Sequence, residues 1–122
     1  MTAARPSVRP RQLVAARSGA YCEIGHVCGP QGAYLPNVAT DVHHRHPAKS
    51  GGSRLGWVHA PSNLLAACRP CHSFVERERL WAVERGLLLP MGTARPLSTP
   101  VDCRHGRVLL DDAGTWTYAV IV

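Results

Sequence analysis

Histidine and cysteine side chains that can bind metal ions or move protons are concentrated in two short stretches of the chain. Residues 41–47 contain the adjacent pair His43 and His44, and the second stretch reads Cys68-Arg69-Pro70-Cys71-His72. Imidazole rings bind transition metals or transfer protons near neutral pH. A Cys-x-x-Cys pair in a chain of this kind usually holds zinc. The sequence therefore predicts metal chemistry centred on these two stretches.

Four of the five cysteines can be grouped into a single zinc site. Cys22 and Cys28 are the only candidates to join the Cys-x-x-Cys pair, because Cys103 stands apart and is expected to be a free, partly buried thiol. Their Cys-x5-Cys spacing is wider than the usual two to four intervening residues, which leaves His26 as an alternative ligand. An odd number of cysteines in a cytosolic chain favours metal over disulfides. The predicted structural Zn²⁺ ligands are Cys22, Cys28, Cys68 and Cys71.

The histidine pair, Asn63 and His72 occur in the order of the HNH nuclease signature, which this chain resembles. The residues between them fit as well, with Gly51-Gly52 in the loop and Ser62-Asn63-Leu64-Leu65 before the second cysteine pair. The resemblance covers about residues 21–79. It implies an α+β fold with a ββα-metal, treble-clef-like core, in which a hairpin and a helix hold one catalytic divalent ion. In many members, four cysteines pin that hairpin to the helix through zinc.

The resemblance also implies a role for each matched residue. His44 matches the general base that takes a proton from the attacking water, and His43 matches the metal ligand just before it. His72 matches a second metal ligand, and Asn63 matches the residue that orients the base-bearing loop. Glu76 stands where many relatives have a further histidine. It is either a third ligand, which as a hard carboxylate would suit Mg²⁺ or Mn²⁺, or an ordinary exposed helix residue.

These assignments predict a metal-dependent DNA endonuclease that hydrolyses phosphodiester bonds with one divalent ion and a histidine base. The family is frequent in phages and mobile elements, so a phage or mobile-element origin is expected. Two alternatives stay open: a zinc-knuckle module that binds DNA without cutting it, and a phage packaging accessory protein with a vestigial nuclease centre. The sequence leaves cleavage specificity open, and it does not decide between a monomer and a homodimer.

The charge of the chain is compatible with a polyanionic partner. The formal net charge is +6 and the isoelectric point is about 9.6. Lys49 is the only lysine, so nearly all of the positive charge is carried by arginine. Arginine suits phosphate oxygens, although a GC-rich genome would produce the same bias.

Histidines outside the candidate sites, and the arginines of the predicted long helix, are not expected to take part in the metal chemistry. We expect His46, His59 and His105 to be surface or core residues, with a phosphate contact as the alternative for His46. The arginines of the predicted long helix are expected to form a solvated face, with contacts to the DNA backbone as the alternative. These arginines are Arg77, Arg79 and Arg85.

No segment of the sequence indicates export or membrane insertion. Residues 1–20 contain arginines but no continuous apolar run, so they do not resemble a signal peptide. Nothing approaches the length of a transmembrane helix. We therefore expect a cytoplasmic protein without a membrane partner.

The predicted elements place the candidate residues as follows. Residues 1–10 are expected to be a flexible basic arm, residues 11–86 the nuclease core, and residues 87–122 a C-terminal β extension packed on it. Within these regions we expect a short helix at 11–17, a hairpin of strands at 21–24 and 39–44, a helical turn at 62–67, a helix at 70–85 stopped by Gly86, and a C-terminal hairpin at 107–110 and 115–122.

Two geometric expectations follow from these elements. Neighbouring side chains of a strand point to opposite faces, so His43 and His44 can share a site only if the strand bends or ends beside them. Pro47 permits such an end because it cannot donate to a ladder. His72 and Glu76 are four residues apart and therefore lie on one face of the predicted helix.

Overall fold

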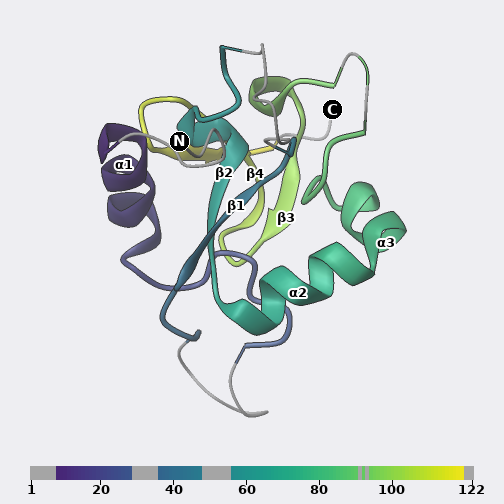
Figure 1. Ribbon diagram of the computed structural model, residues 1–122. Coiled ribbons are helices and arrows are strands. Elements are labelled where there is room, and N and C mark those ends of the chain that lie inside the picture. Colours follow the sequence, from purple (N-terminus) through teal and green to yellow (C-terminus); the bar gives the residue numbers. More distant parts are fainter. Residues whose placement is uncertain (1–7, 29–35, 48–55, 91, 93, 120–122) are drawn as a thin grey trace.

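The computed structural model describes residues 8–28, 36–47, 56–90, 92 and 94–119. In this part of the chain the protein is α+β, with short helices and two small antiparallel sheets (Figure 1). The elements in order are α1 (Val8–Ser18), β1 (Asp41–His44), η1 (Pro61–Asn63), β2 (Leu64–Ala67), α2 (Arg69–Arg77), α3 (Arg79–Glu84), η2 (Pro96–Ser98), β3 (Val101–Cys103), β4 (Gly106–Leu110) and β5 (Trp116–Tyr118).

The centre of the fold is the antiparallel pair β1 and β2, which leads directly into α2 (Figure 1). In its register His43 is opposite Leu65, and His44 is opposite Leu64. The predicted partner of β1 was wrong: within the described residues, the 21–24 segment forms no ladder with β1. It makes an isolated bridge from Tyr21 to Val38, with the backbone hydrogen bonds from Cys22 to Asn37 and from Ala39 to Ala20 beside it. Residues 64–67 were predicted as a helical turn, and they form β2 instead.

Burial on both faces explains why residues 64–67 form a strand. Leu64 and Ala66 pack with Val14 of α1, whereas Leu65 and Ala67 belong to the main core on the other side. All four side chains are buried. A short apolar run that is covered on both faces satisfies its backbone by pairing with a neighbouring strand, and tertiary packing therefore overrides the helical tendency of leucine and alanine.

The predicted helix at 70–85 is divided into α2 and α3. The backbone leaves helical geometry at Glu78, with φ −104° and ψ 63°. Pro70 lies in the first turn of α2, as expected from its missing N–H. Gly86 follows α3 with φ 70°, and a Cβ at this position would lie 2.0 Å from the carbonyl oxygen of Pro100. The predicted stop at Gly86 is therefore required by both conformation and space.

The two ends of the described chain differ from prediction in extent. Helix α1 begins at Val8, so residues 8–10 of the predicted arm are helical, and residues 1–7 lie outside the described residues. The C-terminal hairpin is present as β4 and β5, and β3 adds a third strand to its sheet. Residues 120–122 of the predicted last strand, the Gly51-Gly52 pair and Lys49 also lie outside the described residues.

The C-terminal sheet shares one apolar core with the rest of the protein. Buried residues of β2, α2, the segment after α3 and the C-terminal strands form one cluster, which includes Leu65, Val75, Leu88, Val101 and Val108. Burial of such side chains contributes roughly 1.5–3 kcal/mol each. The segment after residue 86 therefore helps to hold the β1–β2–α2 unit in place.

A buried arginine adds polar links between the same parts. Arg45 is fully buried just after β1 and donates to four backbone carbonyls, those of Gly86, Ser62, Pro96 and Thr99, at 2.7 to 3.2 Å. These bonds satisfy four of the five N–H donors of the guanidinium and so offset the cost of burying its charge. Arg45 thereby fixes the end of β1 relative to the C-terminal segment.

A second buried polar group joins α1 to the C-terminal sheet. Glu23 accepts hydrogen bonds from Arg17 at 2.7 and 2.8 Å and lies 2.8 Å from Nε2 of His105. Burial alone would raise the pKa of Glu23, but these hydrogen bonds outweigh it and the pKa is lowered. His105, expected to be a surface or core residue, therefore has a structural role.

None of the described helices is both long enough and apolar enough to cross a membrane.

Candidate functional site

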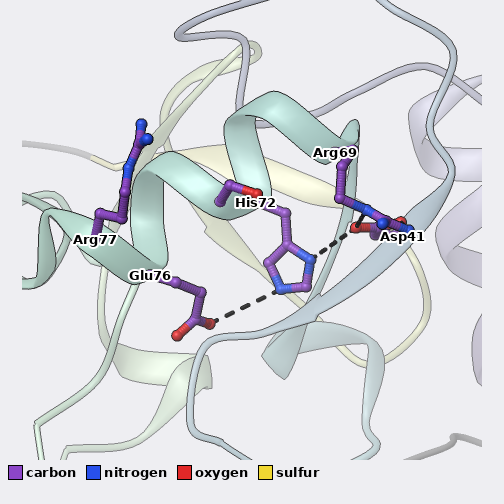
Figure 2. Close-up of a pocket in the computed structure, with 6 residues that line it drawn as sticks. Asp41, Arg69, His72, Glu76 and Arg77 are labelled. Atoms are coloured by element: carbon purple, nitrogen blue, oxygen red, sulfur yellow. Dashed lines mark hydrogen bonds and ion pairs between the residues drawn. The ribbon is translucent and has the colours of Figure 1, made fainter.

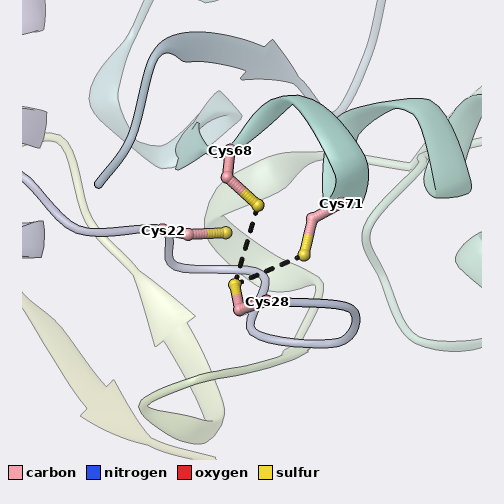
Figure 3. A group of neighbouring side chains, drawn as sticks. All are labelled: Cys22, Cys28, Cys68 and Cys71. Atoms are coloured by element: carbon pink, nitrogen blue, oxygen red, sulfur yellow. Dashed lines mark hydrogen bonds between the residues drawn. The ribbon is translucent and has the colours of Figure 1, made fainter. Parts of the chain in front are cut away.

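The four predicted zinc ligands converge in one cluster (Figure 3). Cys22 and Cys28 come from the segment after α1, Cys68 precedes α2, and Cys71 lies in its first turn. The four Sγ atoms lie within 4.8 Å of one another, and Sγ of Cys28 is 3.7 Å from Cys68 and 3.5 Å from Cys71. Zn–S bonds of about 2.3 Å in a tetrahedron place sulfur atoms about 3.8 Å apart. The cluster could therefore hold a metal ion, with zinc as the fitting choice.

The other two residues considered for this site lie outside the cluster. The ring of His26 packs against Phe74 and Trp81, with centroid distances of 4.6 and 4.3 Å. His26 is therefore a packing residue in this structure and is not part of the sulfur cluster. Cys103 is a free thiol 3.6 Å from the carbonyl oxygen of Gly106, and burial raises its pKa to about 11.

A second group of potential ligands is formed by His43, His72 and Glu76, whose ligand atoms lie within 4.8 Å of one another. His43 projects from β1 and is buried, whereas the other two project from one face of α2. The expected alignment of His72 and Glu76 is found, with Nε2 of His72 3.8 Å from a carboxylate oxygen of Glu76 (Figure 2). A strand and a helix thus bring together three residues that are separated by up to 33 positions in the chain (76 − 43).

The hydrogen bonding of His43 leaves one ring nitrogen available. Nε2 of His43 lies 2.6 Å from the carbonyl oxygen of Leu87. A carbonyl can only accept, so Nε2 carries the proton and the neutral ring has its lone pair on Nδ1. Nδ1 is buried and has no hydrogen-bond partner. Burial lowers the pKa of His43 to about 4, so the ring is neutral at pH 7. An orphaned, neutral imidazole nitrogen fits a metal ligand.

The orientation of His72 is set by Asp41, a residue that the sequence prediction missed. Nδ1 of His72 lies 2.9 Å from a carboxylate oxygen of Asp41, which also accepts two hydrogen bonds from Arg69 at 2.8 and 3.1 Å (Figure 2). The hydrogen bonds from Arg69, together with the contact to His72, lower the pKa of Asp41 to about 2 although burial acts to raise it, so Asp41 is ionised. In the neutral ring Nδ1 therefore carries the proton, and Nε2 faces Glu76. Metal-binding histidines are commonly oriented by carboxylates in this way.

A signal for Asp41 was present in the sequence. Asp41 and His43 are two residues apart in β1, so strand alternation directs both side chains to the same face. Asp41 also lines an open pocket of about 590 Å³ at the surface of α2. The other residues that line this pocket are Arg69, His72, Ser73, Glu76 and Arg77. The candidate ligands on α2 are therefore accessible from solvent.

His44 lies outside the ligand group and pairs with another histidine. Strand β1 ends at His44, as expected, and Nε2 of this residue lies 3.0 Å from Nδ1 of His59. Burial, followed by the charges of His59 and His72, lowers the pKa of His44 to about 4. The ring is therefore neutral at pH 7. His59, expected to be a surface or core residue, is partly buried and directly contacts the candidate base.

Asn63 joins the segments that carry this histidine pair. Its Oδ1 accepts from the backbone N–H of His46 at 2.8 Å, and its Nδ2 donates to the carbonyls of His46 at 3.1 Å and Val58 at 2.8 Å. His46 follows His44 by two residues, and Val58 precedes His59 by one. Asn63 is fully buried, so these bonds fix the end of β1 against the turn that contains His59.

The structure thus places the predicted residues in three adjoining groups. These are the sulfur cluster, the His43–His72–Glu76 group, and the His44–His59 pair held by Asn63. The chain matches no family model, no curated protein and no solved structure. The chemistry of these residues is therefore the basis of the function proposed next.

Proposed function

We propose that this protein is a metal-dependent DNA endonuclease of the HNH type. The observation that carries the proposal is the buried Nδ1 of His43, which has no hydrogen-bond partner. His43 itself belongs to a three-residue ligand group, and the other two members line an open pocket. A binding module has no need for such a nitrogen. The order β1–β2–α2 also agrees with the ββα-metal arrangement implied by the sequence resemblance.

Phosphodiester hydrolysis requires an activated water and a fixed geometry at phosphorus. His44 would act as the general base, because its ring is neutral at pH 7 and it follows the candidate ligand His43 in the chain without belonging to the ligand group. Asn63 would hold the backbone on both sides of the His44–His59 pair through its three hydrogen bonds. The base would therefore meet the water in one orientation.

His43, His72 and Glu76 would hold one divalent ion. Such an ion supplies charge stabilisation to the phosphoryl group and the leaving oxygen when it is bound. Asp41 would keep the proton of His72 on Nδ1, so that Nε2 offers its lone pair to the ligand position. The carboxylate of Glu76 makes the set harder than one of three imidazoles, which suits Mg²⁺ or Mn²⁺.

The sulfur cluster would have a structural role. Four thiolates around zinc leave no open coordination position, so this ion would not take part in hydrolysis. Cys68 and Cys71 flank the start of α2, and His72 follows directly. A zinc ion there would fix the first turn of the helix that carries His72 and Glu76.

The accessible side of the site is suited to a phosphate backbone. Arg69 and Arg77 line the same pocket as His72 and Glu76, and the whole chain carries a formal charge of +6. Arginine forks bind phosphate oxygens. Duplex DNA is therefore the proposed substrate, with the arginines contacting phosphates next to the scissile bond.

The test is cleavage of supercoiled plasmid by zinc-loaded protein, with Mg²⁺, with Mn²⁺, and with EDTA added just before the DNA. We expect metal-dependent nicking or linearisation. His44→Ala should reduce the rate about 10²- to 10⁴-fold while leaving DNA binding and zinc content unchanged. This variant, purified in parallel, also controls for contaminating nucleases.

Equal cleavage by wild type and His44→Ala would refute the assignment of His44 as the base. DNA binding by the wild type without any cleavage, in either metal, would instead support the zinc-knuckle binding module. Loss of binding together with cleavage in His44→Ala would make His44 a contact residue.

A further inference from the structure

We infer that His59 is a positioning residue that holds the base His44 in the tautomer whose Nδ1 can accept a proton; this inference rests on the nuclease function proposed above. It starts from the 3.0 Å contact between Nε2 of His44 and Nδ1 of His59. The two rings meet nearly edge to face, with centroids 5.1 Å apart and an interplanar angle of 74°. This geometry directs a nitrogen of one ring at a nitrogen of the other.

A hydrogen bond between two neutral imidazoles requires one donor and one acceptor. If His44 donates from Nε2, its lone pair is on Nδ1, and the ring can take a proton there. If His59 donates instead, Nε2 of His44 is occupied as the acceptor and Nδ1 carries a proton. Only the first arrangement leaves His44 able to act as a base. His59 would therefore act as the acceptor, a role that backbone carbonyls or carboxylates fill for many catalytic histidines.

The surrounding hydrogen bonds hold the two rings at this distance. Asn63 bonds to both backbone groups of His46 on one side and to the carbonyl of Val58 on the other. The N–H of Ala60 donates to the carbonyl of Trp57 at 3.0 Å, which closes the turn around His59. The N–H of Arg45 donates to the carbonyl of Asn63 at 2.8 Å. Backbone on both sides of each histidine is thus fixed by bonds that do not involve the imidazoles.

This framework gives Asn63 a more specific function than orienting one loop. Asn63 sets the separation between two segments, and each segment carries one member of the histidine pair. His59 is only partly buried, so a substitution of its ring should leave the fold intact. The pair can therefore be tested without removing Asn63.

The experiment compares His59→Asn, His59→Gln and His59→Leu in single-turnover plasmid cleavage with saturating Mg²⁺. The Asn oxygen is attached to Cγ, as Nδ1 is in histidine, and can accept at nearly the same point. Gln places its acceptor one atom farther out, and Leu has none. We expect His59→Leu to lower the cleavage rate about 10- to 100-fold, and His59→Asn to keep it within about 5-fold of wild type. The rate of His59→Gln should lie between these two, and DNA affinity should be equal in all four proteins.

A second readout does not depend on cleavage. Long-range ¹H–¹⁵N spectra of histidine-labelled, zinc-loaded protein without Mg²⁺ distinguish the two tautomers of a neutral ring. His44, assigned with the His44→Ala variant, should be in the Nε2–H form in wild type and should lose this preference in His59→Leu.

The two readouts separate this inference from the nuclease proposal. A wild-type His44 in the Nδ1–H form, or equal cleavage rates for wild type and His59→Leu, would overturn the role of His59 and leave the nuclease standing. Equal losses of cleavage rate in His59→Leu and His59→Asn, with unchanged melting temperatures, would also overturn it. An Nε2–H form of His44 in a protein that cleaves no DNA would instead overturn the nuclease and retain the histidine pair.

Discussion

Cys71 and His72 are consecutive residues in α2, yet their side chains belong to two different groups of potential metal ligands. Sγ of Cys71 lies 3.5 Å from Cys28 in the sulfur cluster, whereas Nδ1 of His72 lies 2.9 Å from Asp41. Adjacent residues of a helix project about 100° apart, so one turn can serve two sites. The geometry of the second group therefore depends on the turn that the sulfur cluster holds.

Zinc content and stability should change together when the sulfur cluster is altered. Protein washed free of loose ions should contain about one zinc per chain, measured by elemental analysis. Cys71→Ser should remove the zinc and unfold or aggregate the protein, because a structural zinc contributes folding free energy directly. Cys103→Ser is the matched control, since this thiol lies outside the cluster and serine can also donate to the carbonyl of Gly106. A folded, zinc-free wild type would contradict the assignment.

Asp41→Asn should weaken binding of the second ion without unfolding the protein. Asparagine can still accept from Nδ1 of His72, but it lacks the charge that holds this tautomer and pairs with Arg69. Loss of such an orienting carboxylate typically costs 10- to 100-fold in metal affinity. Titration calorimetry with Mn²⁺ in the absence of DNA measures the effect. Asp102→Asn, which removes an exposed ion pair with Arg107 on the C-terminal sheet, should leave Mn²⁺ affinity unchanged; the same loss in both variants would make the effect nonspecific.

Glu76 should determine which divalent ion supports cleavage. Its carboxylate is half exposed and also pairs with Arg79 at 3.3 Å, so the alternative role as a surface residue makes a distinct prediction. If Glu76 is a ligand, Glu76→Gln should raise the Mg²⁺ concentration needed for half-maximal cleavage, and Glu76→His should favour softer ions. Metal titrations of the cleavage rate would be run for the three proteins in parallel. Coinciding curves would leave Glu76 as a surface residue.

Stability should fall between about pH 6.5 and pH 4 because of His43. Burial lowers the pKa of His43 from 6.5 to about 4 in the folded state. As the pH falls through this window, the unfolded chain takes up a proton before the folded chain does, and unfolding is favoured. The full effect is on the order of 3 kcal/mol. Urea unfolding at pH 7 and pH 4.5 measures how much unfolding free energy wild type and His43→Gln each lose over this pH interval. Any loss of zinc in acid affects both proteins alike and therefore cancels in the comparison. Parallel losses of stability would exclude His43 as the cause.

Local patterns in the sequence predicted where α2 begins, where α3 ends, and which cysteine, histidine and glutamate side chains come together. Gly86 ends α3 and Pro70 lies in the first turn of α2, because each effect is a property of a single residue's backbone. The four cysteines converge as expected, and His72 and Glu76 share a face because they lie four apart in one helix. In each case the information lies within one element or in a residue type with few possible partners.

Contacts between distant segments were decided only by the tertiary structure. Residues 64–67 are a strand because α1 covers one face and the main core covers the other, and the partner of β1 changes as a consequence. His59 resembles any other polar residue in the sequence, and strand alternation places Asp41 on the face of His43 without indicating its partner in α2. They gain their roles from helix α2 and from the turn held by Asn63, which bring them to His72 and His44. Hydrogen bonds act over about 3 Å in space, and residue types and spacing along a chain do not determine which side chains come that close.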